Sequence, residues 1–380
     1  MEPDSEFSFD GSWPRVEALL GGAGEIDALA RATGALKRRR EVRDGSQLLR
    51  LALGYAATGR SLRTTAAWSG PALGVDLSDV ALLGRLREAG DFLASLTTRL
   101  LTRLAEVAAP SETWHGPPIR LVDGSMFAGP GGKGGQHRLH ATYDPARQMF
   151  TAFDLTSHKE GESLSRGGIE PGAIGLGDRN YAKTRSLREA EAAGAFYLLR
   201  TGMRSMRMID PRTGERLTGE AVLAALGEGS GAELAIETIE AKARKADGPG
   251  PVKARLVILR ASDAAAAREQ ARIERSRTKH KATPTKETQA LSGVVMLITN
   301  LPPTPWSITR LALLYRLRWQ IELAFKTLKS TFAMRDTPAK DPRLARTWIL
   351  ANLAAALLTE LLLRAIERAI PPSGAHTPPS

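Results

Sequence analysis

The chain has 380 residues, of which 42% are hydrophobic and 25% charged; this suffices for a large catalytic core with smaller modules and excludes wholesale disorder. Its formal net charge of +12 favours a polyanionic partner such as nucleic acid, although basic enzymes of other classes share it. The absence of cysteine excludes disulfides, thiolate metal sites and thiol nucleophiles.

The N-terminal part has helical patterning, and we expect a helical DNA-binding domain over residues 1–110. A short helix at 61–68, a connector at Gly70–Gly74 and a further helix after an N-cap at Ser78 resemble a helix-turn-helix. A basic run upstream is a candidate for contacting DNA phosphates, with a solvated helix face as the alternative; it comprises Lys37, Arg38, Arg39 and Arg40.

Strand signals follow and indicate a mixed α/β core, whose first part we place at residues 111–201. One apolar run ends in Asp123 and a later one ends at Asp178, each followed by a turn-like sequence. Between them, residues 138–143 and 149–155 indicate a pair of strands. Both aspartates are therefore expected at strand ends.

The composition changes again in residues 202–290. Two strand-like runs precede a helical stretch rich in arginine, which predicts a β-rich insertion with a basic arm. The core is expected to resume over residues 291–370, with a long helix at about Ser307–Ser330 and a C-terminal helix. Residues 371–380 are expected to form a disordered tail.

The helix at about Ser307–Ser330 has two distinct faces. Steps of three, four and seven residues place four polar side chains in one stripe, namely Tyr315, Arg318, Glu322 and Lys329. The opposite side is expected to pack on a sheet through Leu313, Leu317, Ile321, Ala324 and Leu328. An ordinary amphipathic helix with salt pairing is the alternative.

Asp123, Asp178 and Glu322 together offer the oxygen-only ligand set that Mg²⁺ or Mn²⁺ prefers. Two such ions roughly 3.5–4 Å apart can activate a water or a 3′-hydroxyl and stabilise the leaving oxygen of a phosphodiester. The three acids therefore favour phosphoryl transfer on a nucleic acid.

The polar stripe has the spacing Tyr-x2-Arg-x3-Glu-x6-Lys without a gap, and the sequence here resembles the DDE transposases of the insertion-sequence-four group. Leu121–Ser125 and Gly177–Tyr181 look like the two aspartate blocks of that family. The resemblance covers about residues 30–365, and the glutamate block is its specific part. One departure is Asn180, where many relatives have glycine.

This resemblance implies an RNase H-like catalytic core with a β-rich insertion between the second aspartate and the glutamate. It implies that Asp123, Asp178 and Glu322 are catalytic and hold two Mg²⁺ or Mn²⁺ ions. The DNA end would be bound by Tyr315, Arg318 and Lys329, and Arg179 is a further DNA-binding candidate. In relatives of this family the insertion also helps to hold a flipped base of the DNA end, but no aromatic residue in 202–290 can be assigned to this role.

The resemblance also implies the reaction and its partners. A homodimer would hold the terminal inverted repeats of a mobile element, cut the DNA through a hairpin and join it to target DNA. Two alternatives stay open: an inactive or domesticated DNA-binding descendant, and an RNase H-like nuclease that cleaves without joining.

Several other residues compete for chemical roles. The loop Gly129–Gly135 lacks the residues of a phosphate-binding loop, and His137 and His140 lack a third zinc ligand. Asp154 and Glu162 are rivals for metal ligation, of which Glu162 fits a supporting position and Asp154 a structural one. Packing is the expected role of Trp306, Trp319 and Phe325.

The chain is expected to be cytoplasmic and associated with the nucleoid. Its acidic N-terminus lacks the apolar segment of a signal peptide. The most hydrophobic stretch, about Thr347–Leu363, contains Asn352 and Glu360 and is short for a bilayer span, so it predicts a buried helix and no membrane partner.

Overall fold

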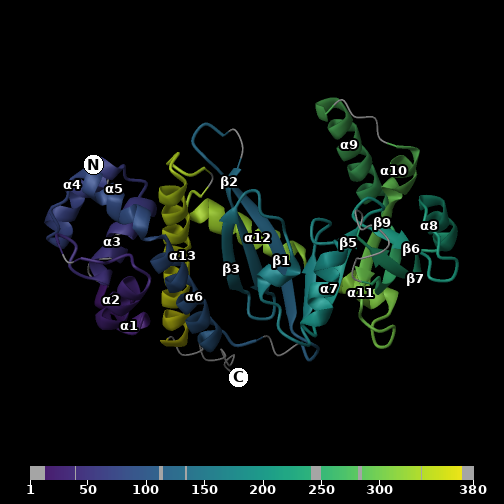
Figure 1. Ribbon diagram of the computed structural model, residues 1–380. Helices are drawn as coiled ribbons and strands as arrows, with labels where there is room; N and C mark the ends of the chain where they lie inside the picture. The colour runs from purple at the N-terminus through teal and green to yellow at the C-terminus, as the bar shows by residue number, and fades with distance from the viewer. Residues whose placement is uncertain are drawn as a thin grey trace, which may run out of the picture.

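The computed structural model describes residues 13–38, 40–110, 114–132, 135–240, 250–280, 285–334 and 336–369. Helices form one end of the molecule, a large sheet its middle, and a strand-and-helix region the other end (Figure 1). The N-terminal helices are α1 (Trp13–Leu19), α2 (Ala23–Ala32), α3 (Gly45–Ala56), α4 (Leu62–Leu73), α5 (Asp79–Glu88) and α6 (Gly90–Val107).

The helix-turn-helix candidate corresponds to α4 and α5, with a shorter turn than predicted. Ser78 is the N-cap of α5, since its hydroxyl accepts a hydrogen bond from the amide of Ala81 at 3.2 Å, which confirms that prediction. The connector prediction at Gly70 was wrong, because α4 continues to Leu73. The helix stops where Gly74 adopts a left-handed conformation (φ 63°) that a glycine tolerates without strain.

Close packing of α2 against α3 depends on Gly45. A Cβ atom at this position would lie 2.4 Å from the carbonyl oxygen of Ile26. We expect Gly45→Ala to lower the free energy of unfolding by about 2 kcal/mol, as overpacking does elsewhere. Chemical denaturation measures this. Gly84→Ala is the matched control, because nothing lies within 4 Å of its Cβ position; an equal loss in both variants would contradict the packing argument.

Nine strands form one mixed sheet in the order β3-β2-β1-β4-β5-β9-β8-β7-β6. β1, β4 and β5 are parallel, and every other neighbouring pair is antiparallel. The strands are β1 (Ile119–Ala128), β2 (Gly135–Asp144), β3 (Met149–Ser157), β4 (Ile174–Gly177), β5 (Phe196–Thr201), β6 (Arg207–Ile209), β7 (Gly231–Ile239), β8 (Val252–Arg260) and β9 (Val294–Thr299). This arrangement confirms the predicted α/β class with N-terminal and C-terminal helices.

The two faces of the sheet carry separate hydrophobic cores. Leu121, Leu176 and Leu198 are in register and belong to the core that includes the C-terminal helices. Val122 and Leu199, one position further along their strands, belong to the core that includes α7 (Thr184–Ala192). Because strand side chains alternate between faces, each strand end can direct a side chain to either core.

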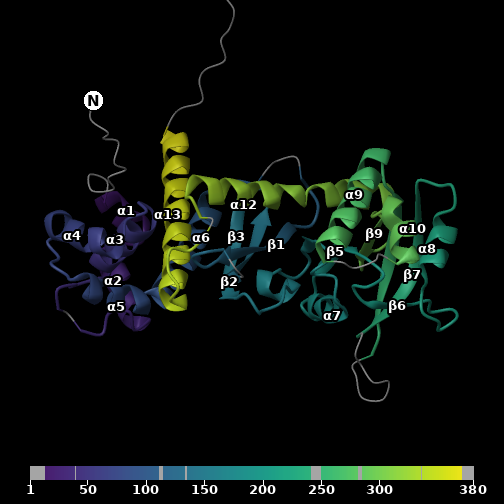
Figure 2. The same cartoon turned by 90° about the horizontal axis from the view of Figure 1, so that it is seen from above.

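The expected long helix is divided into α11 (Ile308–Arg316) and α12 (Trp319–Thr331). The prediction of one continuous helix was wrong at Leu317 and Arg318. There the amide of Arg318 bonds the carbonyl of Tyr315 at 3.1 Å, which is a tighter turn than an α-helix makes. α12 nevertheless extends across the sheet as a straight rod (Figure 2).

The buried side chains of α11 and α12 differ in part from those predicted. Leu311 and Leu314 face the core while Leu313 is 56% exposed, so its predicted packing role was wrong. The prediction of a packing role was also wrong for Trp319, which is 62% exposed. Trp306 and Phe325 are buried as predicted.

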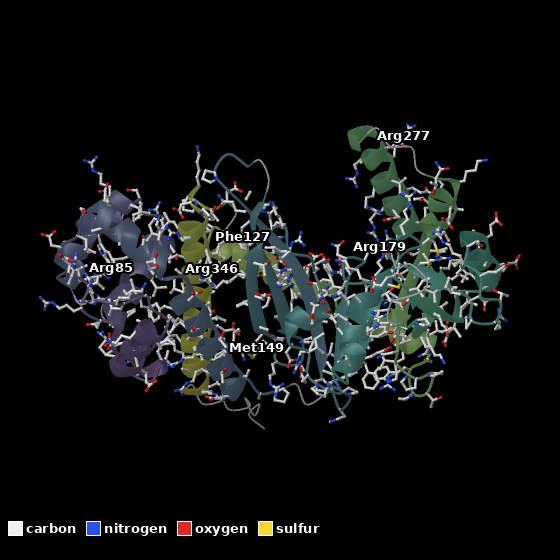
Figure 3. The ribbon with its side chains drawn as sticks, in the orientation of Figure 1. Arg85, Phe127, Met149, Arg179, Arg277 and Arg346 are labelled. Carbon is white, nitrogen blue, oxygen red and sulfur yellow. The ribbon has the colours of Figure 1, made fainter. Side chains whose placement is uncertain are left out.

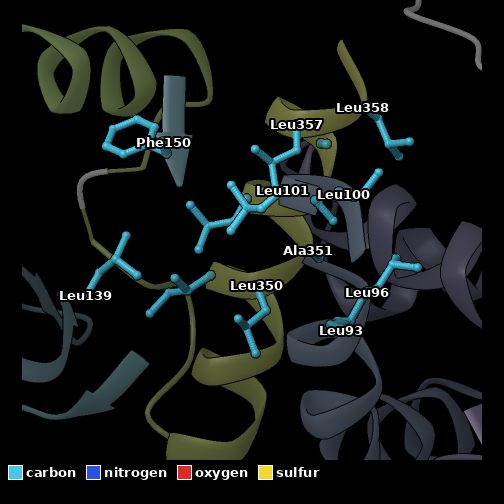
Figure 4. Close-up of a cluster of buried hydrophobic side chains, with 14 of the residues drawn as sticks. Leu93, Leu96, Leu100, Leu101, Leu139, Phe150, Leu350, Ala351, Leu357 and Leu358 are labelled. Carbon is cyan, nitrogen blue, oxygen red and sulfur yellow. The ribbon is translucent and has the colours of Figure 1, made fainter. Parts of the chain in front are cut away.

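The C-terminal helix α13 (Pro342–Ala369) packs lengthwise against α6, and Leu350, Leu357 and Leu358 contribute to the buried cluster between them (Figure 4). Within the described chain, residues 342–368 form the one helix long and apolar enough to cross a membrane, with a mean hydropathy of 1.8. Its most apolar window is 56% buried inside the protein. Packing in the core therefore accounts for its hydrophobicity, as predicted.

The region beyond β5 contains α8 (Gly219–Leu226), α9 (Asp263–His280) and α10 (Lys286–Ala290). The basic helix α9 projects away from the sheet (Figure 1). β9 pairs with β5 on one side and β8 on the other, so the sheet runs without a break into this region. The division into sequence domains stays a prediction. The predicted tail at 371–380 lies outside the described residues.

Candidate active site

Asp123 lies inside β1 and not at its end, so that detail of the prediction was wrong. It pairs with Ala141 of β2 on one side. On the other side the parallel pairing with β4 ends at Leu121 and Leu176. Asp123 therefore stands where its neighbouring strand stops, and alternation directs its side chain to the same face as Leu121.

Asp178 directly follows β4, as predicted, and begins a tight turn. One oxygen of its carboxylate accepts the amide N–H of Asn180 at 2.8 Å, and the other accepts the Asn180 side-chain amide at 3.4 Å. Asn180 is not among the described residues with a positive φ. Asn180 therefore stabilises this turn through its side chain and does not adopt the left-handed conformation that a glycine at this position would allow.

Glu322 lies in the first turn of α12, above the sheet face to which Asp123 points. Its Oε1 accepts a hydrogen bond from Nη2 of Arg318 at 2.5 Å. The Glu322 side chain is 42% exposed and that of Arg318 20% exposed. A pair this accessible to water contributes little to stability, so it can open when another ligand competes.

The three predicted acids interact electrostatically. The pKa of Asp123 is raised to about 6, mainly by burial and also by the charges of Asp178 and Glu322, while the amide of Gly124 and the charge of Arg318 oppose the shift. Three carboxylates thus share one region with incomplete neutralisation. Such a region attracts a cation.

The donor chemistry fits a divalent metal, but the ligand set is not fully assembled. Among the residues that the structure describes, no three His, Asp or Glu side chains are close enough together to hold a metal ion. Glu322 is engaged by Arg318, and its carboxylate would have to turn from that partner to join the aspartates. The oxygen-only set suits Mg²⁺ or Mn²⁺ once this happens.

The other members of the stripe on α11 and α12 lie around the same acids. The hydroxyl of Tyr315 donates to the carbonyl of Gly177 at 3.3 Å, and burial raises the pKa of Tyr315 to about 12. Nζ of Lys329 donates to the carbonyl of Met126 at 3.1 Å and lies 4.6 Å from the ring centroid of Phe127. Burial lowers the pKa of Lys329, and the charge of Asp123 opposes that shift.

Arg179 connects the turn after Asp178 with the basic arm. Its guanidinium lies 3.7 Å from Glu269 of α9, which also pairs with Arg272 at 2.7 Å. Figure 3 shows Arg179 near the base of α9 and Arg277 toward its tip. A cavity of about 340 Å³ between them is lined by arginines, including Arg204. The arm therefore begins next to the turn that contains Asp178.

The basic run near the N-terminus is not part of this site. Lys37, Arg38 and Arg40 line a cleft of about 500 Å³ together with Arg85 of α5, in the helical end of the molecule. Arg39 lies outside the described residues. The structure brings the run to the helix-turn-helix candidate and keeps it apart from the three acids.

The remaining candidates have other surroundings. His137 and His140 are buried, and no cluster of metal-ligand type includes them in the described chain. Asp154 pairs with Arg166 at 3.0 Å, as expected of a structural residue. Glu162 lies near Asp178, whose charge adds to the effect of burial in raising the pKa of Glu162.

Sequence reasoning missed the side-chain role of Asn180 and the place of Phe127 near the site. Asn180 bonds Asp178 through its side chain, and its place two residues after a strand-end aspartate was a usable signal. The contact between Phe127 and Lys329 joins residues 202 positions apart, and nothing in the local sequence indicates it.

Comparison with known proteins shows a family model described as a transposase DDE domain that matches residues 114–358. The transposase for insertion sequence element IS421 of Escherichia coli is 37% identical over 355 residues, which cover 93% of this chain and 94% of the relative. The InsL protein for element IS186A of Escherichia coli (strain K12) is 37% identical over the same shares of both chains. The transposase for element IS231D of Bacillus thuringiensis subsp. finitimus is 24% identical, covering 82% and 71%.

Proposed function

The chain belongs to the family of DDE transposases of insertion sequence elements, and on that premise we propose that it is a member of the insertion-sequence-four group whose catalytic residues are Asp123, Asp178 and Glu322. The observation that carries this assignment is that Asp178 and Glu322 come close enough to the buried Asp123 for their charges to raise its pKa. The four-residue signature that begins at Tyr315 supports the group.

Enzymes of this family use divalent metal ions, and we propose that these three carboxylates hold two of them. When bound, the ions activate water or a 3′-hydroxyl and stabilise the leaving oxygen. The protein's own contribution is to place carboxylates from two strands and a helix around one point. Opening of the Arg318–Glu322 pair would release both a carboxylate for the metal and a guanidinium for the DNA.

Transposases bind the DNA of their element ends, and two surfaces of this chain suit that task. Tyr315, Arg318 and Lys329 would bind the phosphates next to the cut, with Arg179 on the far side of Asp178. The exposed ring of Trp319 lies beside Arg318 and offers a face on which a base can stack. The run that includes Lys37 and Arg40 would contact terminal-repeat phosphates beside α5.

We expect Arg318→Ala to weaken binding of element-end DNA about 10-fold at moderate salt, because one charge-assisted phosphate contact is lost. The slope of log K against log salt should fall by about one. Binding titrations of end DNA at several salt concentrations measure both.

Arg310→Ala is the control for Arg318→Ala. Arg310 lies on α11, where its guanidinium stacks on Trp306 at 4.7 Å. An unchanged salt slope in the Arg318 variant, or an equal change in the Arg310 variant, would remove Arg318 from the DNA contact.

We propose that the segments of the chain have different functions. Residues 1–110 bind DNA, residues 111–201 and 291–370 catalyse the reaction, and the arm within 202–290 holds the DNA end. We further propose that a homodimer pairs two ends, that cleavage passes through a hairpin, and that the soluble enzyme works in the cytoplasm at the nucleoid. One experiment tests the reaction: incubation of labelled duplex carrying the element's ends with enzyme and Mg²⁺.

The products separate the alternatives. A hairpin intermediate followed by a product joined to target DNA supports the proposal. Binding without cleavage would indicate an inactive or domesticated descendant, and cleavage without strand transfer would indicate an RNase H-like nuclease.

A further inference from the structure

The cavity of about 340 Å³ where α9 meets the sheet, called the α9 cavity below, gathers positive charge. Its four arginines come from three separate segments of the chain. They are Arg179 from the turn after β4, Arg204 from the turn after β5, and Arg272 and Arg277 from α9. A recess on which cations converge concentrates the electric field, so it attracts an anion.

Two carboxylates, those of Glu269 and Glu287, also line the α9 cavity in the part of the chain that the structure describes. Glu287 has another partner, because its Oε1 accepts the amide N–H of Gly219 at the start of α8 at 2.8 Å. Arg204 donates to a neutral group, the hydroxyl of Thr285 at 3.4 Å. Glu269 is therefore the anion that faces the arginines, and four cations against two carboxylates leave the cavity positive.

The carboxylate of Glu269 is held as a phosphate would be. Arg272 donates two hydrogen bonds to it, from Nε to Oε2 at 2.9 Å and from Nη2 to Oε1 at 2.7 Å. Nη1 of Arg179 lies 3.7 Å from the same Oε1. Two-pronged binding of two oxygens by one guanidinium is how arginine binds carboxylate and phosphate alike. Glu269 therefore occupies a position that suits a phosphate group.

Arg179 has donor capacity that Glu269 does not use. The distance of 3.7 Å is too long for a hydrogen bond. Nε of Arg179 is buried and has no hydrogen-bond partner among the described residues. The cavity wall beside it is Gly202, whose Cβ position lies 4.0 Å from this Nε, so no side chain blocks the approach there. A buried donor without a partner is costly, and an anion in the cavity would relieve that cost.

Arg200 adds a further cation beside the α9 cavity. The parallel pairing of β5 with β4 ends at Leu199 and Gly177. Arg200 is the next residue on β5, so it comes level with Asp178 and close to Arg179. Its Nε is also buried without a hydrogen-bond partner in the described chain. Burial lowers the pKa of Arg179, and the charge of Arg200 lowers it further, so this pair of cations lacks compensation.

We propose that the α9 cavity binds one phosphodiester group of the DNA end, and that the carboxylate of Glu269 occupies this position until DNA arrives. The phosphate displaces Glu269 and takes over Arg179 and Arg272. Because Arg179 directly follows Asp178, the site holds the strand close to the cut. This inference rests on the proposed function in taking the ligand to be the DNA that Asp178 acts on. Glu269 is then an internal competitor that lowers the affinity for DNA.

Glu269→Gln is the main test, since it keeps the shape and removes the competing charge. In metal-free buffer with EDTA, the variant should bind end duplex about 5-fold more tightly than the wild type. A duplex of unrelated sequence at low salt should give the same ratio, because phosphates carry no sequence information. Glu106→Gln is the control for the change in net charge. Glu106 pairs with Arg103 at 4.0 Å on α6, and its substitution should change the affinity much less.

Arg272→Met separates competition from a structural role of the ion pair. If Glu269 competes with phosphate, this variant should bind DNA about 10-fold more weakly, opposite in sign to Glu269→Gln. If the pair only fixes α9 in place, both variants will bind more weakly, and the inference is overturned.

Arg275→Met is the control for Arg272→Met, because Arg275 lies on the same helix outside the lining of the cavity and donates to the carbonyl of Ala271. It should weaken binding less. This comparison also keeps the test decisive if Glu269→Gln has a lowered melting temperature, since equal losses in the two arginine variants would remove the proposed phosphate site.

The binding measurements need no cleavage, so the two proposals can fail separately. Tighter binding by Glu269→Gln, together with a wild-type enzyme that never cleaves, would overturn the proposed function and leave the phosphate site standing. Unchanged or weaker binding by a folded Glu269→Gln variant, with normal cleavage by the wild type, would overturn the inference alone.

Discussion

Replacing Glu322 by glutamine is expected to reduce DNA cleavage at least about a thousandfold, equivalent to about 4 kcal/mol of transition-state stabilisation. Binding of end DNA should persist, because the amide removes only a proposed metal ligand and leaves Arg318 free to contact phosphate. Gel-shift titration and a nicking assay on the same end duplex measure the two effects.

The control for Glu322→Gln is Glu360→Gln. Glu360 also pairs with an arginine four residues away, Arg364 at 2.8 Å, on α13, although there the glutamate comes first. The Glu360→Gln variant should cleave end DNA at the wild-type rate. Retained cleavage in the Glu322 variant would take Glu322 out of the metal site and leave the Arg318 pair as a surface ion pair.

Asp123→Asn should abolish cleavage and at the same time stabilise the metal-free protein. Its folded pKa of about 6 exceeds the ordinary value of 3.8, so the protonated form favours folding. This contribution is fully present below pH about 4 and is lost as the pH rises through about 6. At neutral pH the substitution should raise the free energy of unfolding by about 2 kcal/mol, measured by denaturation without metal.

Asp144→Asn should have the opposite effect on stability. That carboxylate is also buried, but it pairs with Arg120 at 2.9 Å and Arg147 at 3.0 Å. Loss of its charge removes the carboxylate partner of Arg147 and leaves Arg120 with Glu170, and it should destabilise the fold by about 3 kcal/mol. If both variants shift in the same direction, the carboxylates around Asp123 do not repel one another as described.

The sequence was informative where the determining signal is local. The polar stripe from Tyr315 to Lys329 follows from helical periodicity, and the apolar run before Asp178 follows from strand composition, so the three acids could be named without coordinates. Ser78 was recognisable as an N-cap for the same reason. Each of these signals lies within one continuous stretch of the sequence.

Features that depend on distant partners could not be predicted. Asp123 lies just beyond the point where the neighbouring strand β4 ends, and not at the end of its own strand. β4 is more than 50 residues away in the sequence. Leu313 and Trp319 are exposed because α11 and α12 pack on the sheet through a side centred on Leu314 and Ile321, and the position of the sheet is not written in the local sequence. The place of Glu162 depends on a missing side chain at Gly124 of another strand.

The unbroken sheet limits which segments can be deleted from this enzyme. β9 has hydrogen-bonded neighbours on both sides, β5 and β8. Excision of residues 202–290 would leave the apolar sequence Val-Val-Met-Leu-Ile-Thr of β9 as a bare edge, and such an edge invites pairing with the same strand of other molecules. A shortened enzyme should therefore aggregate unless β7 and β8 are retained, and the arm is better removed by cutting α9 alone.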